Sequence, residues 1–142
     1  MTTPDGVDST VVFDTEPLVA YFCDEPGADT VQRYVQAVEG SVDGFVSTVN
    51  LAEIRYVVRA IEDRELADTV ERVMAESGIE RVDTTETWRT AARFKHRHSP
   101  ALGDAFALAT ADAVDGTLLV GADDDYDELT DVSVERFRTD PV

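Results

Sequence analysis

Four acidic residues stand at equivalent positions relative to the strands and helices that the sequence predicts. Each follows the end of an expected strand or lies in the first turns of an expected helix. In the open parallel sheets of α/β proteins these ends share one rim, and ligands bind outside it. We therefore expect acids that are far apart in the sequence to share one pocket: Asp14, Glu53, Asp104 and Asp123.

A pocket shared by four carboxylates has a defined chemistry. The charges repel one another, so some of the acids stay protonated unless a cation neutralises them. Carboxylate oxygens and water suit the hard ions Mg²⁺ and Mn²⁺. One or two such ions activate water and stabilise the attacking and leaving oxygens of a phosphodiester. The set predicts metal-dependent phosphodiester hydrolysis, although each acid alone is equally typical of a turn, a helix terminus or a solvated surface.

Strands and helices alternate along the whole chain in the hydrophobic pattern. Short apolar runs predict strands at residues 9–15, 43–49, 79–82, 116–120 and 131–137. Helical spacing predicts helices at residues 16–23, 27–40 and 87–98, two more within 50–78, and one that Pro100 opens. Asp83 and Glu86 have the spacing of a capping box before the helix at 87–98. The alternation is typical of an α/β fold whose parallel sheet is covered on both faces.

The composition indicates one folded domain over residues 1–142, with residues 1–8 expected to be disordered. Hydrophobic residues make up 43% of the chain and charged residues 30%, the balance of a globular protein. The single Cys23 excludes an internal disulfide and a cysteine-based zinc cluster. No apolar run reaches about 18 residues and the N-terminus is polar, so we expect a cytoplasmic protein with no membrane span and no signal peptide.

The net charge of −18, from 30 acidic and 12 basic residues, would ordinarily argue against a nucleic-acid partner. The acids are spread over the whole chain, Asp outnumbers Glu, and only one of the basic residues is a lysine. This composition resembles that of proteins from halophilic archaea, in which molar salt screens the repulsion between surface charges. We interpret the charge as a surface adaptation, and an acidic protein that binds a basic partner is the alternative.

Four blocks of the sequence resemble the PIN-domain ribonucleases, and among them the toxin component of VapBC toxin–antitoxin pairs. The blocks are VVFDTEPLVAYF, STVNLAEIRYVV, LGDAFALATA and LLVGADDDYDEL, and they span nearly the whole chain. The resemblance implies a three-layer α/β sandwich around a mostly parallel sheet of four or five strands, and Mg²⁺- or Mn²⁺-dependent cleavage of single-stranded RNA. It implies an acidic metal-binding set made of Asp14, Glu53, Asp104 and Asp123, with Asp125 as a further nearby acid.

The resemblance also implies partners for the chain. A small antitoxin that blocks the site is expected, and a homodimer is common in the family. The apolar face of residues 28–38, with Leu18, Tyr21 and Phe22, forms either a groove for a helix of that partner or ordinary core. One departure concerns Gly121, because the family usually carries Thr or Ser two residues before the last acid. A hydroxyl that would help to hold the site is missing there.

One segment departs from the general acidity and would suit an RNA substrate. Residues 87–103 contain no Asp or Glu and carry several cations directly before Asp104. We predict that the phosphate backbone of RNA contacts Arg89, Arg93, Lys95 and Arg97, with Arg55 and Arg59 as a second contact. The alternative is that these cations pair with surface acids. The neighbouring Trp88 and Phe94 are expected in the core.

Two other functions stay open. A metal-dependent phosphatase or phosphoacceptor would use Asp14 as its nucleophile. Such chemistry usually needs a lysine near the acids, and the only lysine, Lys95, lies in the basic segment. A catalytically silent PIN-like binding or scaffold domain would keep the fold and lose acids. All four acidic positions are filled, and only Gly121 favours the silent domain.

Overall fold

A computed structural model describes residues 10–122, 126 and 129–138 of the chain. The disorder expected for residues 1–8 therefore concerns a segment outside the described residues. Among the described residues, no helix is both long and apolar enough to cross a membrane.

Five short strands form one sheet in the order β3-β2-β1-β4-β5. Every neighbouring pair is parallel, and Val12 at the centre pairs with Phe45 on one side and Leu118 on the other. The strands are β1 (Thr10–Phe13), β2 (Asp43–Ser47), β3 (Ile79–Val82), β4 (Thr117–Val120) and β5 (Val134–Arg136). This arrangement confirms the predicted α/β fold with a central parallel sheet.

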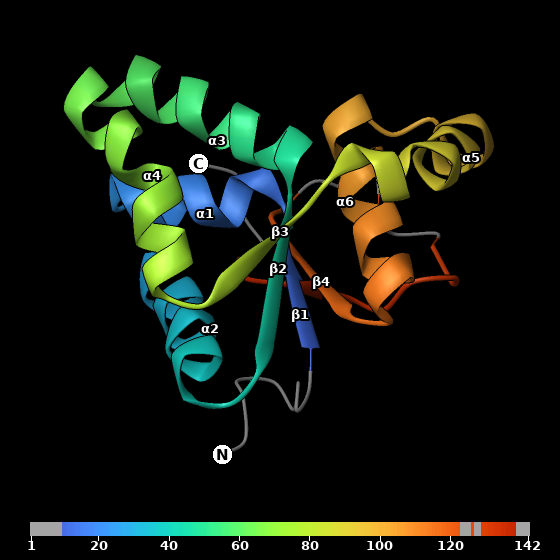
Figure 1. Cartoon of the computed structure of the whole chain (residues 1–142), viewed down its shortest axis with the longest axis horizontal. Coiled ribbons are helices and arrows are strands. Elements are labelled where there is room, and N and C mark those ends of the chain that lie inside the picture. Colours follow the sequence, from blue (N-terminus) through green and yellow to red (C-terminus); the bar gives the residue numbers. More distant parts are fainter. Residues whose placement is uncertain (1–9, 123–125, 127–128, 139–142) are drawn as a thin grey trace.

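Helices cover both faces of the sheet, as Figure 1 shows, and complete a three-layer sandwich. One layer holds α1 (Thr15–Cys23), α2 (Ala28–Gly40), α3 (Thr48–Ile61) and α4 (Arg64–Glu76). The other holds α5 (Trp88–His98) and α6 (Leu102–Val114), preceded by the short 3₁₀ helix η2 (Thr84–Glu86).

The strand β1 divides the interior into two apolar clusters, because its side chains alternate between the faces of the sheet. Val11 and Phe13 pack with the layer of α1 to α4, while Val12 packs with α5 and α6. The apolar face of α2 belongs to the first cluster, where Val31 is fully buried against core residues that include Leu18. The apolar face of α2 and Leu18 are therefore core rather than an open groove, whereas Tyr21 and Phe22 are only partly buried.

Several predicted boundaries are wrong. The strands expected at residues 9–15 and 131–137 are Thr10–Phe13 and Val134–Arg136, and the helix expected to open at Pro100 begins at Leu102. Two further errors have clear local reasons. The strand expected to run through residue 49 ends at Ser47, because the Ser47 hydroxyl accepts the amide of Val49 at 3.2 Å and starts α3. The capping box of Asp83 and Glu86 does not form, and the Asp83 side chain makes no capping hydrogen bond. Its backbone carbonyl accepts the Glu86 amide instead, which produces the 3₁₀ turn and delays the next helix to Trp88.

Candidate active site

A cleft of about 720 Å³ opens at the carboxyl ends of the central strands. It brings together Asp14 after β1, Glu53 on α3 and Asp104 in the first turn of α6. Asp123 and Asp125 lie outside the described residues. The other lining residues are Thr15, Glu16, Val19, Glu25, Val57, Ile61, Gly121, Ala122, Tyr126 and Arg138.

Asp14 is the most deeply placed acid of the cleft, with 4% of its surface exposed. Its Oδ1 accepts the backbone amide of Thr15 at 2.8 Å and so caps α1. Its Oδ2 accepts the hydroxyl of Tyr126 at 2.6 Å, and its own amide donates to the carbonyl of Leu119 on β4 at 3.0 Å. Asp14 is thus both a helix cap and a buried carboxyl aimed at the cleft.

The electrostatics around Asp14 favour its protonated form. Burial raises the pKa of Asp14 well above the usual carboxyl range, and the neighbouring charge of Asp104 raises it further. The hydrogen bonds from Tyr126 and Thr15 lower this pKa and oppose the shift only in part. Burial and the charge of Asp14 also raise the pKa of Tyr126, so the phenol keeps its proton and remains a donor. Burial and the neighbouring Asp104 therefore both disfavour the ionised form of Asp14.

Asn50 joins the elements that carry these acids, and it is fully buried. Its Nδ2 lies 3.0 Å from the carbonyl of Gly103, 3.1 Å from Thr15 Oγ1 and 3.2 Å from Glu53 Oε1. Asp14 Oδ1 is a more distant acceptor at 3.4 Å. The Thr15 hydroxyl in turn donates to Glu53 Oε1 at 2.7 Å. One amide thus ties α3 to the start of α1 and to α6.

Gly103 allows Glu53 to lie against α6. A Cβ atom at this position would stand 2.2 Å from Glu53 Oε1, so any side chain would push that carboxylate away. Because Gly103 directly precedes Asp104, the missing side chain brings two of the predicted acids into one cleft.

The sequence reasoning missed three polar residues of this network: Thr15, Asn50 and Tyr126. Asn50 stands three residues before Glu53, which is helical spacing for a shared face, and it is the signal that could have been found. Tyr126 lies within an acidic run that resembles a solvated turn, so nothing local indicated its burial.

The predicted RNA contacts are exposed, and several pair with acids as the alternative proposed. Arg93 lies 4.0 Å from Asp112, and Arg97 lies 3.6 Å from Asp131. Surface pairs of this kind contribute little free energy, so a phosphate can replace the acid. The same holds for Arg55, which pairs with Asp68 at 2.6 Å.

The remaining predicted contacts lie along the same two helices. Arg89 and Arg59 are exposed, whereas Lys95 donates a hydrogen bond to the carbonyl of Pro100 at the start of the next helix. The prediction of a core position for Trp88 is wrong, because 48% of its surface is exposed. Trp88 is the first residue of α5, beyond the edge of the core, and the guanidinium of Arg89 lies 4.4 Å from the centre of its ring. Phe94 is buried as predicted.

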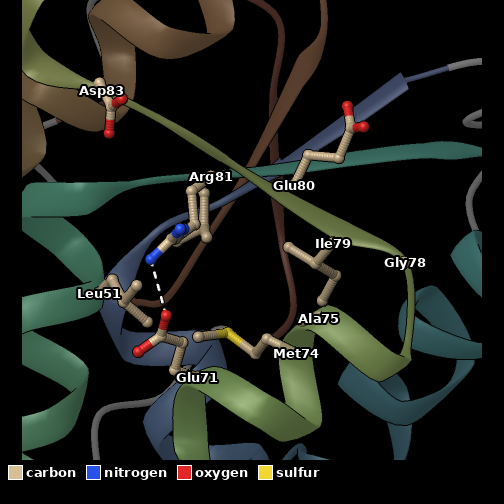
Figure 2. A pocket seen from close by; sticks show the side chains of 10 residues that line it. Leu51, Glu71, Met74, Ala75, Gly78, Ile79, Glu80, Arg81 and Asp83 are labelled. Carbon is tan, nitrogen blue, oxygen red and sulfur yellow. Dashed lines mark hydrogen bonds and ion pairs between the residues drawn. The ribbon is translucent and has the colours of Figure 1, made fainter.

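A second hollow of about 540 Å³ lies between α4 and the edge strand β3 (Figure 2). Met74 and Ile79 form its apolar floor, and Arg81 reaches Glu71 at 2.7 Å across it. Glu80 points away from this pair and Asp83 lies apart from it in Figure 2. The three acids of the hollow, Glu71, Glu80 and Asp83, lie apart from one another in Figure 2, so the cleft around Asp14 is the stronger candidate site.

A family model described as PIN domain matches residues 11–132. No curated protein matches the chain significantly. Among solved structures, the chain is similar to "VapBC2 from Rickettsia felis bound to a DNA fragment from their promoter", with a TM-score of 0.68, 15% identity, and coverage of 89% of this chain and 98% of that one. It is also similar to a toxin–antitoxin complex from Klebsiella pneumoniae, with a TM-score of 0.62, 19% identity, and coverage of 86% and 94%.

A third similar structure is FitAcB from Neisseria gonorrhoeae, with a TM-score of 0.57, 18% identity, and coverage of 87% and 95%. At these identities the likeness concerns the fold. The similar chains are matched over nearly their whole length, so the sheet and both helical layers are shared rather than one motif.

Proposed function

The chain belongs to the PIN domain family, and from this membership we propose that it is a divalent-metal-dependent endoribonuclease that acts as the toxin of a toxin–antitoxin pair. The observation that carries the proposal is the buried carboxyl of Asp14 beside Asp104 in an open cleft. Burial disfavours the charged form of Asp14, and the partly exposed Asp104 beside it adds a like-charge repulsion that a cation would relieve. Such a pair is therefore typical of a site that receives a cation.

The acids would hold Mg²⁺ or Mn²⁺ through Asp14, Glu53, Asp104 and Asp123, with Asp125 as a further nearby acid. Oxygen donors alone favour these hard ions over zinc or copper. Within residues 10–122, 126 and 129–138, no three acidic, histidine or cysteine side chains are gathered closely enough to form a complete metal site. Two of the proposed ligands lie outside these residues, and Glu53 Oε1 is engaged by Thr15 and Asn50.

The bound ion would polarise the scissile phosphate and lower the pKa of a water molecule. The side chains of the cleft have separate tasks. The Tyr126 hydroxyl and the Thr15 amide fix both oxygens of Asp14, and Asn50 with Thr15 orients Glu53. These hydrogen bonds hold the acids in place before substrate arrives, which is the preorganisation that a hydrolytic site needs.

Single-stranded RNA would approach over the exposed cations of α5 and α3. We assign phosphate contacts to Arg89, Arg93, Lys95 and Arg97, with Arg55 and Arg59 as a second contact. The exposed ion pairs of Arg93, Arg97 and Arg55 support this assignment, because a polyanion competes well for cations that weak surface pairs hold.

The proposed partners are a small antitoxin protein and a second copy of the chain, in the cytoplasm. The similar solved structures include toxin–antitoxin assemblies, one of them bound to promoter DNA, and they support an antitoxin partner. Halophilic origin is proposed from composition alone.

Cleavage of a labelled single-stranded RNA pool tests the function. The wild-type protein with Mn²⁺ should cut the pool over part of a KCl series, and EDTA or Asp14→Asn should abolish cleavage. Asp115→Asn is the matched control, because Asp115 is an exposed acid outside the cleft, at the opposite end of α6 from Asp104. Absence of cleavage at every salt concentration at which the protein is folded would favour a silent PIN-like scaffold.

A further inference from the structure

A single peptide group at the end of β4 is held from both sides by charged side chains. Arg136, the last residue of β5, donates from Nη1 to the carbonyl of Gly121 at 2.8 Å. The amide of Ala122 donates to Oε2 of Glu16 at 3.3 Å. This carbonyl and this amide belong to the same peptide bond. Its orientation is therefore fixed between β5 and the first turn of α1.

Arg138 fixes the carboxylate that takes part in this arrangement. Its Nε and Nη2 lie 3.1 Å and 3.0 Å from Glu16 Oε2, and its Nη1 donates to the carbonyl of Pro26 at 2.9 Å. Only 10% of its side chain is exposed, and Glu25 lies 3.7 Å away as a second acid. The Glu16 side chain is 37% exposed, so the shielding comes from the Arg138 side, and a pair with one buried partner holds its geometry better than a fully exposed pair.

Glu16 also fills the space that Gly121 leaves. A Cβ atom on Gly121 would lie 1.8 Å from Glu16 Oε2. The position where similar sequences usually carry a hydroxyl is therefore not empty in this chain. A carboxylate from α1 enters it and meets the backbone directly.

We propose that Glu16 and Arg138 are positioning residues of the active site, which replace the absent side chain of residue 121 by clamping the Gly121–Ala122 peptide. The four residues line the same cleft as Asp14 and Asp104, and the clamped peptide directly precedes Asp123 in the sequence. Arg138 engages Glu16, so this acid serves the backbone rather than the cation. The catalytic consequence rests on the proposed nuclease function, whereas the clamp itself does not.

Three variants test the clamp: Glu16→Gln, Arg138→Gln and the double variant Glu16→Gln/Arg138→Gln. Each should speed hydrogen exchange of the Ala122 amide and weaken Mn²⁺ binding about tenfold, as loss of an outer partner of a metal ligand does. In RNA cleavage, kcat should fall by about the same factor while KM stays constant. The double variant should be no worse than either single one, because both substitutions break one unit.

Four further variants separate positioning from simple loss of charge. Arg138→Lys should recover part of the kcat, and Arg72→Gln, which breaks the exposed pair with Glu76, should change nothing. Gly121→Ser should impair Mn²⁺ binding because its side chain displaces Glu16, and Glu16→Ala in the same protein should relieve the impairment.

The proposal would be overturned if every Glu16 and Arg138 variant kept the wild-type rate of Ala122 amide exchange and the wild-type affinity for Mn²⁺. So would losses that simply follow a lower unfolding midpoint or that add up in the double variant. If the wild-type protein cleaves no RNA, the proposed function fails, and amide exchange with Mn²⁺ binding still decides whether the clamp exists.

Discussion

Asp14 combines two roles that usually occur separately. As the cap of α1 it needs only an oxygen acceptor, and asparagine serves as well as aspartate in that position. As a buried carboxyl it has an ionised form that its burial and the neighbouring Asp104 both destabilise. The helix cap alone does not require this charge.

The pH dependence of stability follows from the raised pKa of Asp14. Between the usual carboxyl pKa of the unfolded chain and the raised pKa of the native state, the native protein binds the extra proton. The free energy of unfolding therefore falls as pH rises through this window, and the loss is complete above the native pKa.

Without divalent cations, Asp14→Asn should consequently be more stable than the wild type at neutral pH and lose less stability between mild acid and neutral pH. Tyr126 can accept from the new amide, so the hydrogen bond survives. Urea unfolding in EDTA across this pH range measures the difference, with Asp115→Asn as the control. A wild-type protein whose stability rises steadily with pH while Asp14→Asn is less stable would contradict this account.

In α6, the glycine at residue 103 determines where the Glu53 side chain can lie. Replacing a helical glycine by alanine ordinarily stabilises a helix by about 1 kcal/mol. At Gly103 the new Cβ would meet the carboxylate of Glu53, the far end of a flexible side chain that can move aside. The fold can therefore accommodate alanine at residue 103, whereas Glu53 would be displaced from its position in the cleft.

Gly103→Ala should therefore keep or raise the unfolding midpoint and lower RNA cleavage about tenfold or more, as disturbance of metal-ligand positions does. Gly40→Ala, at the exposed end of α2, is the control and should leave cleavage unchanged. Parallel thermal unfolding and cleavage measurements separate the two effects. Full activity in Gly103→Ala would show that Glu53 need not lie where the structure has it.

The basic helix α5 should act on affinity rather than on chemistry. The double variant Arg93→Gln/Arg97→Gln removes two proposed phosphate-binding side chains and should raise KM for all RNA sequences alike. For single strands the slope of log affinity against log salt should fall by about 0.7 for each phosphate that is no longer neutralised. Cleavage kinetics across KCl concentrations give this slope, and a change in kcat with an unaltered slope would count against the assignment.

The positions of strands and helices were easier to predict from sequence than the residues at which they begin and end. Short apolar runs and helical spacing located the strands and the helices, because one face of each must be buried. Ser47 and Asp83 set boundaries through single hydrogen bonds that spacing does not encode. Trp88 was misplaced because hydrophobic character alone does not say that a helix begins beyond the core.

At the scale of the whole molecule, the topology made the site predictable. Parallel strands bring their carboxyl ends to one rim, so Asp14, Glu53 and Asp104 could be placed in one cleft from sequence order alone. The supporting groups could not be placed in the same way. Asn50 shares a helical face with Glu53, but its contacts with Thr15 and Gly103 join separate segments. Arg138 meets Glu16 across 122 positions of the sequence, so only the folded chain shows these contacts.

The charge of −18 predicts a salt-dependent stability. The Debye length falls from about 10 Å in 0.1 M salt to about 3 Å in 1 M salt, which screens repulsion between exposed acids. The unfolding midpoint should therefore rise as KCl increases over this range, and it should rise equally with NaCl. A midpoint that is constant or falls would show that the acids are balanced locally by their ion pairs.

The central claim is that the cleft acids bind one kind of ligand, a divalent cation, and calorimetric titration of Mn²⁺ tests it most directly. Wild-type protein and Asp115→Asn should bind with the same affinity, whereas Asp104→Asn should bind about tenfold more weakly or not at all. Equal affinity of the wild type and Asp104→Asn, or no binding by either, would contradict the claim.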